Sequence, residues 1–268
     1  MKILAEEIAQ TLEDDLDDIV REIAKDKNVG IFVDNPDLLE DRLKKWHQFG
    51  LVTHTKKVRG AFNREIKEFL VKWSVFEEIE RELSEEIDGV RKKILLEISV
   101  SLHDLGKIVC YGSTAKNRGH EFESTVLLKE DYLKNKLIGY GLSVKQIEYV
   151  TRCVETHFSL GQEMRDALKD NGLLNMEYLS DYKSKEGIDK LCERIGEKYA
   201  DVKIEIGVFF LADCLGKTDV RSALNNLDRE SIEGEIKDRG LPEELINAAM
   251  QLPLSVMLAE RYLRWVCE

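Results

Sequence analysis

The chain of 268 residues is 43% hydrophobic, which is enough for one large domain, or one domain with terminal extensions, around a substantial core. It carries 52 acidic and 40 basic residues, and the formal net charge of -12 disfavours binding to duplex nucleic acid. No apolar run approaches the roughly 18 residues of a membrane span, and the N-terminus turns acidic too early for a signal peptide. We expect a cytoplasmic globular protein without a membrane partner.

Five cysteines are scattered along the chain, and no two of them form a Cys-x-x-Cys pair. An odd number at irregular spacing argues against a disulfide framework and against a zinc site built from thiolates. We therefore expect reduced thiols at Cys110, Cys153, Cys192, Cys214 and Cys267.

Helix signals occur along most of the chain and strand signals are few, so the sequence predicts an all-α fold. Asn35 before Pro36 has the pattern of a helix N-terminus, and residues 62–75 and 79–88 also have helical patterns. Ser143-Val-Lys-Gln matches a capping box, and Pro242 is placed to begin a later helix.

The terminal segments have helical patterns but lack the chemical motifs of the central part. We expect a central domain over residues 46–220. A helical N-terminal extension, residues 1–45, and a helical C-terminal extension, residues 221–268, would pack on it.

The pair His103-Asp104 continues a predicted helix. Leu96, Val100 and His103 recur at i, i+4 and i+7, so His103 extends an apolar row and Asp104 follows directly. Burying an unpaired carboxylate is costly, and a hydrogen-bonded partner or a metal relieves that cost. The pair therefore points to a site inside the protein.

Two further ligand-type residues lie on apolar helix faces. His157 extends the row Ile147, Val150 and Val154, the inward face of the helix that starts at the capping box. Asp213 extends a row of large apolar residues that begins at Ile206. The sequence thus directs carboxylates and imidazoles from separate helices toward one interior.

Each inward histidine, taken alone, is also explained as a hydrogen-bonded core residue, so a purely structural role stays open. Neutral imidazole and carboxylate are, however, good ligands for first-row divalent metals. An aspartate is rarely buried without a partner. The joint pattern favours a metal site, whereas His47 lacks such a pattern and is expected at the surface or at a helix end.

The order of these residues resembles that of a known family. The ordered elements are His54, His103-Asp104-Leu105-Gly106-Lys107, Gly119-His120-Glu121, Glu155-Thr156-His157 and Ala212-Asp213-Cys214-Leu215-Gly216-Lys217. They are similar to the HD superfamily of metal-dependent phosphohydrolases, in particular to the HD domains beside tRNA nucleotidyltransferases and in stand-alone hydrolases. The resemblance covers about residues 50–220 and implies an HD-domain-like helical bundle.

The resemblance also implies a ligand set. His54, His103, Asp104 and Asp213 would bind one metal ion, and in the two-metal members of the family the aspartate at Asp104 bridges to a second ion. Here His120 and His157 would bind that second ion. The chain departs from the family at one point, because His54 precedes His103 by 49 positions, which is longer than usual. We expect an inserted helical hairpin or an unusually long helix in this interval.

The implied activity is that of a metal-dependent phosphohydrolase, either a phosphomonoesterase or a phosphodiesterase, acting on a nucleotide or another small phosphate ester through a metal-bound hydroxide. Asp104 and Lys107 are the expected catalytic residues. Lys107 lies three positions after Asp104, where a cation could stabilise developing negative charge; the alternative is a solvent-exposed lysine. Lys116 and Arg118 are further candidates for contact with phosphate.

Several points stay open at this level. Histidine and aspartate ligands do not distinguish Mn, Fe, Co, Ni, Zn or Mg, nor one ion from two. A metal-binding but non-hydrolytic module that senses nucleotides is the main alternative function. A helical interaction protein with structural histidines is another, and a homo-oligomer is compatible with the sequence.

Overall fold

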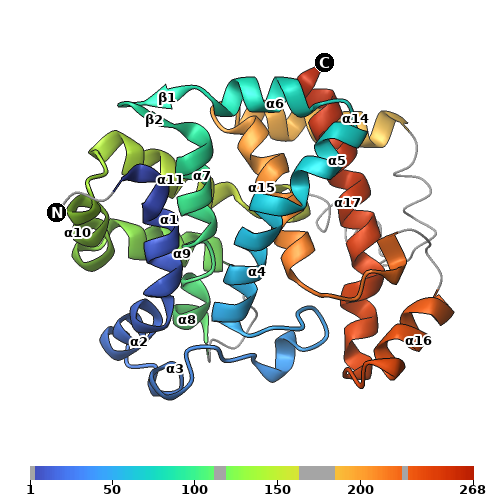
Figure 1. The fold of residues 1–268 in the computed structure, drawn as a ribbon, viewed down its shortest axis with the longest axis horizontal. Helices are drawn as coiled ribbons and strands as arrows, with labels where there is room; N and C mark the ends of the chain where they lie inside the picture. The colour runs from blue at the N-terminus through green and yellow to red at the C-terminus, as the bar shows by residue number, and fades with distance from the viewer. Residues whose placement is uncertain (1–3, 112–118, 163–184, 225–228) are drawn as a thin grey trace.

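The computed structural model describes residues 4–111, 119–162, 185–224 and 229–268 (Figure 1). These ranges form helices joined by loops, with one short antiparallel hairpin of two strands, which confirms the all-α class. No helix within them is both long and apolar enough to cross a membrane. Lys116 and Arg118, the further candidates for phosphate contact, lie outside the described residues.

The elements of the described ranges fall into three groups along the chain. The first group comprises α1 (Ala5–Asp14), α2 (Leu16–Asp26), α3 (Gly30–Asp34), the 3-10 helix η1 (Asp41–Leu43), α4 (Leu51–Arg64), α5 (Ile66–Lys72) and α6 (Phe76–Leu83). The second comprises β1 (Glu86–Ile87), β2 (Val90–Arg91), α7 (Lys92–Val100), α8 (Gly106–Cys110), α9 (His120–Lys129), α10 (Asp131–Tyr140) and α11 (Val144–Thr156). The third comprises α14 (Lys185–Lys198), α15 (Lys203–Gly216), η2 (Ser222–Leu224), α16 (Arg229–Asp238), η3 (Glu243–Leu245) and α17 (Ile246–Cys267).

Helix α15 is the central element, and it makes its most extensive contacts with α4 and α17 (Figure 1). It is buried along nearly its whole length, as expected for a helix that is apolar on almost every side. One apolar cluster joins α15 mainly to α4, α5, α6, α14 and α17, while a second joins α1, α2 and α3 to α7–α11. The helices at both ends therefore share cores with the central ones. The division into a domain and two extensions stays a prediction.

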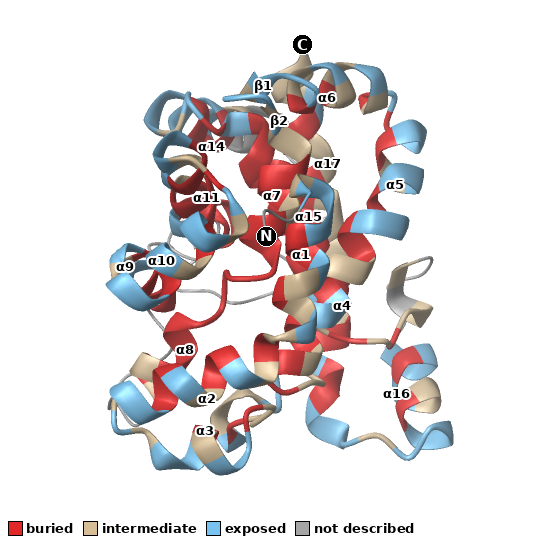
Figure 2. Ribbon diagram, turned by 60° about the vertical axis from the view of Figure 1, so that its left-hand side comes forward, coloured by how far each residue is buried: buried red, intermediate tan, exposed pale blue. Residues whose placement is uncertain are grey.

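The segment that carries the His103-Asp104 pair runs between these two clusters. Residues 98–108 are all buried, from the end of α7 through the following turns into α8. Figure 2 shows this buried stretch leading from α7 to α8, while the outer faces of α2, α5 and α16 are exposed. The pair therefore lies in the interior of the protein, as its helical row predicted.

The interval between His54 and His103 differs in part from the expectation. Helices α4 and α5 follow each other almost directly, but the predicted helix over residues 79–88 is wrong beyond Leu83. There the chain forms the hairpin β1–β2, in which Asp88 and Gly89 both have positive φ, 49° and 82°. An Asp-Gly pair favours this two-residue hairpin turn, and its signal outweighs the helical pattern.

Two of the three predicted helix starts are confirmed. Ser143 and Gln146 form a complete capping box at α11, and Pro242 immediately precedes η3, which leads into α17. The start predicted at Pro36 is wrong, because residues 36 and 37 form a turn. The Asp37 carboxylate instead accepts hydrogen bonds from the backbone nitrogen and the hydroxyl of Thr53, at 2.7 and 2.5 Å, in the first turn of α4.

Helices α15 and α4 make a close contact that depends on a glycine. A Cβ atom at Gly216, the last residue of α15, would lie 2.5 Å from Val58 Cγ2 and 2.8 Å from the backbone nitrogen of Val58 in α4. Only glycine permits α15 and α4 to approach this closely. The contact fixes the distance between Asp213, on α15, and His54, on α4.

We expect Gly216→Ala to lower the free energy of unfolding by about 1–3 kcal/mol, because the added methyl group forces the two helices apart. Denaturant unfolding followed by circular dichroism measures this change. The control is Gly234→Ala in α16, where nothing lies within 4 Å of the new Cβ. That substitution should leave stability unchanged or raise it by up to about 1 kcal/mol. Equal losses in both variants would contradict the role of the close contact.

Candidate metal centre

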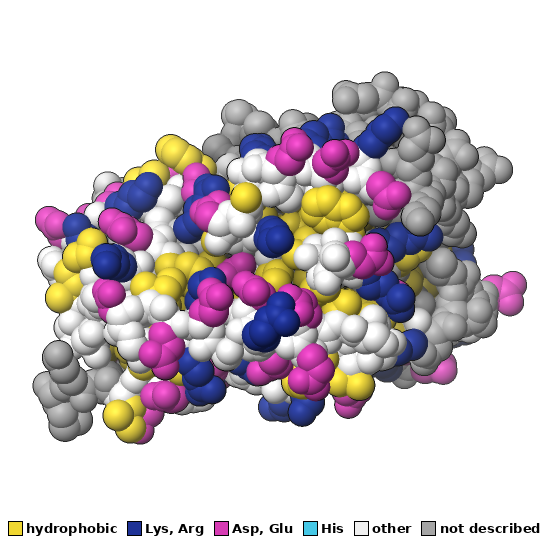
Figure 3. Space-filling model, turned by 90° about the horizontal axis from the view of Figure 1, so that it is seen from above, with side chains coloured by type: hydrophobic (Ala, Val, Ile, Leu, Met, Phe, Trp, Pro, Cys, Tyr) yellow, Lys and Arg dark blue, Asp and Glu magenta, His cyan; other side chains and the backbone are white. Residues whose placement is uncertain are grey.

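All five histidines of the chain belong to one continuous array in the interior. The ring centroids lie 4.8 Å apart for His47 and His54, 5.5 Å for His54 and His103, 5.0 Å for His103 and His157, and 5.3 Å for His120 and His157. On the face drawn in Figure 3, acidic and basic side chains are interspersed and no histidine is visible among the coloured atoms. The histidines are thus concentrated in one buried place.

Three of these histidines are held in the same way, by the carbonyl group at the end of a helix. His54 Nδ1 lies 3.2 Å from the carbonyl oxygen of Gly216, the last residue of α15. His103 Nδ1 lies 2.8 Å from that of Val100, the last residue of α7, and His157 Nδ1 lies 2.7 Å from that of Val154 near the end of α11. Because a carbonyl oxygen only accepts, Nδ1 is the donor in each ring.

This arrangement directs Nε2 of each ring toward the centre. A neutral imidazole that donates through Nδ1 carries its lone pair on Nε2, the arrangement commonly found in metal-binding histidines. His103 Nε2 is buried and has no hydrogen-bond partner among the described residues. His54 Nε2 lies 3.1 Å from Asp213 Oδ1 and 3.3 Å from Asp104 Oδ2, so a lone pair would face two carboxylates unless a proton or cation lies between them.

Asp104 is the shared member of the site. Its Oδ2 lies 3.3 Å from both His54 Nε2 and His103 Nε2, while its Oδ1 lies 3.2 Å from His120 Nε2. The two oxygens of one carboxylate therefore face two different sets of imidazoles. A carboxylate in this position can bridge two metal ions.

The local sequence around Asp104 explains how it reaches this position. A Cβ atom at Gly106 would lie 2.1 Å from the carbonyl oxygen of His120, so glycine is needed where α8 meets α9. The Ser124 hydroxyl in α9 donates to the carbonyl of His103 at 2.6 Å and accepts from the backbone nitrogen of Gly106 at 2.8 Å. These contacts fix Asp104 relative to His120, the first residue of α9.

Each buried aspartate also pairs with a lysine that follows it closely in the chain. Lys107 Nζ lies 2.5 Å from Asp104 Oδ2, and Lys217 Nζ lies 2.6 Å from Asp213 Oδ2. Lys107 is 8% exposed, so the alternative of a solvent-exposed lysine is wrong. Lys217 belongs to the sequence motif at Asp213, but the resemblance implies no role for it. Its spacing of four residues from Asp213 in a helical pattern was the signal for this ion pair.

The ionisation of the site follows from these contacts. Burial raises the pKa of both aspartates, but neighbouring imidazoles and lysines outweigh it and hold the pKa of Asp104 and Asp213 well below its usual range. Burial lowers the pKa of His54 and His120, but hydrogen bonds to carboxylates outweigh it and raise both values. Burial and the adjacent His103 and His120 lower the pKa of His157 to about 3. The site therefore combines ionised carboxylates with a neutral His157.

His47 is buried, although the sequence predicts a position at the surface or at a helix end. It lies in the loop before α4 and is only 9% exposed, with its ring against that of His54. Burial, together with the charges of Lys107 and His54, lowers its pKa well below the ordinary value. No helical or strand period marks a loop residue, so the sequence offered no signal for this position.

The residues present fit a divalent metal ion. Two groups offer one ligand atom per residue within 4.8 Å of one another: His54, His103 and Asp104, and Asp104, His120 and His157. Asp213 reaches the first group through its contact with His54 and lies 3.8 Å from His103 Nε2. The Nε2 atom of His103, which has no hydrogen-bond partner among the described residues, and the ionised carboxylates supply the lone pairs and negative charge that a cation requires.

The chain matches no protein-family model, no curated protein and no solved structure. The structure itself brings together the six candidate metal ligands and the second catalytic candidate, Lys107. The six candidates are His54, His103, Asp104, His120, His157 and Asp213. Their assignment as ligands stays a prediction. The function of the centre is inferred from its residues and their geometry.

We expect the protein, after reconstitution with manganese and removal of free metal, to retain at least one divalent ion per chain. Asp213→Asn should reduce this content strongly, because it removes a charge next to His54. Asp219→Asn is the control, since Asp219 is a nearby aspartate paired with Lys57 near the surface. Elemental analysis measures the content. A wild-type value below about a tenth of an equivalent would be inconsistent with a metal centre.

The shared carboxylate predicts a second ion. If Asp104 bridges two ions roughly 3.5–4 Å apart, His120→Ala and His157→Ala should each lower the metal content from two equivalents to one, while the first ion remains. Metal titration and a crystal structure of the manganese-soaked protein measure this. A single ion, with both histidines more than about 4 Å from any second metal peak, would reject the two-metal site.

Proposed function

We propose that the protein is a metal-dependent phosphohydrolase that acts on a nucleotide or another small phosphate ester, as a phosphomonoesterase or a phosphodiesterase. The observation that carries the proposal is the position of Asp104. Its two oxygens face separate imidazole groups, His54 with His103 on one side and His120 on the other, while a lysine neutralises part of its charge.

The histidines and aspartates would hold the metal, and each contributes something different. Asp104 and Asp213 supply negative charge in a buried place, and the helix-end carbonyls fix the orientation of the imidazoles before any ligand arrives. A bound divalent ion supplies Lewis acidity, which lowers the pKa of water toward neutrality and offsets charge on phosphoryl oxygens. Preorganised ligands favour this chemistry because they need little rearrangement during the reaction.

Lys107 would provide a second positive charge for the substrate phosphate. Its ammonium group contacts Asp104 and borders a small pocket next to His54, so it lies close to the proposed metal ligands. A buried cation stabilises developing negative charge more strongly than an exposed one, because little water screens it. Lys107 is therefore the residue proposed to stabilise the transition state.

A panel of phosphate esters tests the proposal. The reconstituted protein is assayed with Mn, Fe, Co, Ni, Zn and Mg against monoesters, cyclic nucleotides and 2',3'-cyclic phosphates, and released phosphate or product is measured. Turnover that depends on the metal supports the proposal. Binding of metal and nucleotide without turnover would favour the non-hydrolytic sensing module, and a protein that binds no metal would favour structural histidines.

Asp104→Ala and Lys107→Ala should behave differently. The first should abolish hydrolysis and metal retention together, because it removes the shared ligand. The second should keep its metal and lose roughly 10²-fold in kcat, the loss expected for a preorganised charged donor. Lys57→Ala is the control, since Lys57 pairs with Asp219 at a more exposed position. Equal metal contents in the first two variants would contradict this division of roles.

A further inference from the structure

The two buried aspartates contact their lysines through oxygens that differ in their surroundings. In Asp213 the two oxygens are divided, because Oδ1 lies 3.1 Å from His54 Nε2 while Oδ2 lies 2.6 Å from Lys217 Nζ. In Asp104 one oxygen has both kinds of neighbour, because Oδ2 lies 3.3 Å from His54 Nε2 and 2.5 Å from Lys107 Nζ. Lys107 therefore lies on an oxygen that faces the imidazoles, whereas Lys217 lies on one that leaves the facing oxygen free.

The position of Lys107 matters for the first ligand group, which consists of His54, His103 and Asp104. Because Asp104 Oδ2 lies 3.3 Å from the Nε2 atoms of both imidazoles, an ion held by this group would share that oxygen with the ammonium group. In a buried place two cations on one oxygen repel strongly, because little water screens their charges. Tight binding of an ion to this oxygen therefore requires that the ammonium group move away.

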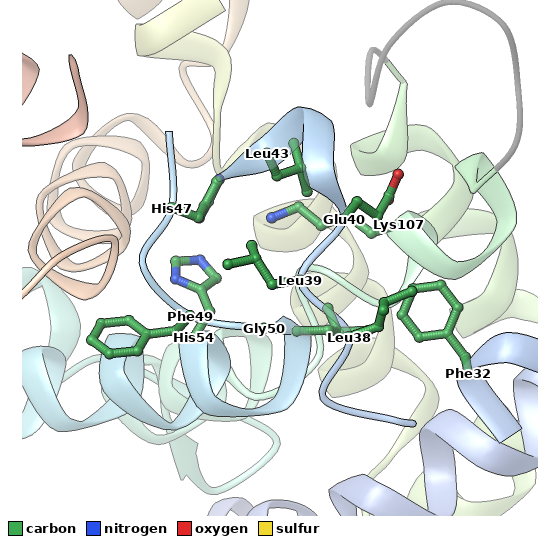
Figure 4. A pocket seen from close by; sticks show the side chains of 11 residues that line it. Phe32, Leu38, Leu39, Glu40, Leu43, His47, Phe49, Gly50, His54 and Lys107 are labelled. Carbon is green, nitrogen blue, oxygen red and sulfur yellow. The ribbon is translucent and has the colours of Figure 1, made fainter. Parts of the chain in front are cut away.

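A small pocket offers the ammonium group another position. The pocket lies next to His54, and its lining includes Lys107 and His47. Figure 4 shows the Lys107 side chain extending from α8 into this pocket. The pocket has room for about one water molecule, which is also the approximate size of an ammonium group. The Lys107 ammonium can therefore move into the pocket by rotation about its side-chain bonds.

The charges of the two aspartate–lysine pairs are balanced before any ion binds. Although burial raises the pKa of Asp104 and Asp213, imidazoles and lysines hold it well below its usual range, so both carboxylates are ionised. Lys107 and Lys217 offset these two negative charges. A divalent ion adds two positive charges to this balanced set. An anion is then favoured beside the displaced ammonium group.

We infer that Lys107 and the first metal ion compete for Asp104 Oδ2, and that binding of the ion releases the ammonium group for the substrate phosphate. Lys217 keeps its contact with Asp213, because the facing oxygen of that residue is already free. Metal binding therefore precedes phosphate binding. The inference rests on the proposed function, and it assigns the order in which the site takes its ligands and the residue that limits its metal affinity.

Two matched variants test the competition. Lys107→Met and Lys217→Met each remove one ammonium group from a buried aspartate and keep an unbranched side chain. The metal-free full chain is titrated with manganese by calorimetry. Lys107→Met should bind the first ion at least about tenfold more tightly than the wild type, because the competing cation is gone. Lys217→Met should bind it at least about tenfold more weakly than Lys107→Met does, because Lys217 does not share the facing oxygen.

Phosphate binding should change in the opposite direction. When the manganese-loaded proteins are titrated with inorganic phosphate, Lys107→Met should bind it about 10–100-fold more weakly than the wild type, the range for a hydrogen bond to a charged group. One substitution thus tightens the metal and weakens the phosphate, a combination that misfolding does not produce. Lys57→Met, at a more exposed ion pair with Asp219, should change neither affinity.

A measurement on the wild type guards against variants that do not fold. NMR spectra of the lysine ammonium groups are recorded for the metal-free chain and again after addition of zinc, which is diamagnetic. Zinc should shift or remove the signal of Lys107, because its ion pair with Asp104 is broken. The signal of Lys217 should persist. Lys107→Arg and Lys217→Arg, which keep the charges, assign the two signals.

The inference is overturned if Lys107→Met binds manganese no more tightly than the wild type, or if both methionine variants gain equally. It is also overturned if zinc leaves the Lys107 signal unchanged, or if the wild type binds no manganese. Turnover of phosphate esters is measured separately. The expected changes in binding without turnover would refute the proposed function and leave the competition at Asp104 standing, whereas turnover without them would do the reverse.

Discussion

The structure depends on the burial of two ionised aspartates, Asp104 and Asp213, between two apolar clusters. Each carboxylate would cost several kcal/mol in this environment without compensation. Compensation comes from a lysine close in sequence to each aspartate and from histidines on other helices. Because the compensating groups come from α4, α8, α9 and α15, removing one of them unbalances charges that several helices share.

The helix ends make the same place favourable for positive charge. The C-terminal end of a helix carries a partial negative charge and free carbonyl groups. The ends of α7, α11 and α15 all point carbonyl groups at the site, and each of these carbonyls holds one imidazole. The backbone therefore performs two functions, because it fixes the ring orientation and adds to the negative potential that attracts a cation. A buried histidine with only a structural role would need a fixed ring orientation, but it would not need this negative potential.

Periodicity predicted the parts of the site that lie on regular helices. His157 and Asp213 extend apolar rows, and both are buried as these rows predict. No such pattern marks the buried His47 and Glu40, because they lie in the loops around η1, where no period applies and only tertiary contacts decide burial. The hairpin at Asp88-Gly89 differs from the predicted helix for another reason, because two residues that favour a hairpin turn outweigh a longer helical pattern. Gly106 and Gly216 matter through contacts with other helices, which a single sequence does not reveal.

The long interval between His54 and His103 is compatible with a compact centre because neither residue is positioned by its neighbours in sequence. His54 is held by α15, through the hydrogen bond to Gly216 and the close contact of Gly216 with Val58. The intervening α5 and α6 pack their apolar faces into the cluster around α15 and α17. The residues in this interval therefore enlarge one apolar cluster, and the distances at the site are set by α4, α15 and the turn before α8. The geometry of this site is in this way independent of the number of residues between His54 and His103, which explains how His54 Nε2 lies only 3.3 Å from Asp104 Oδ2.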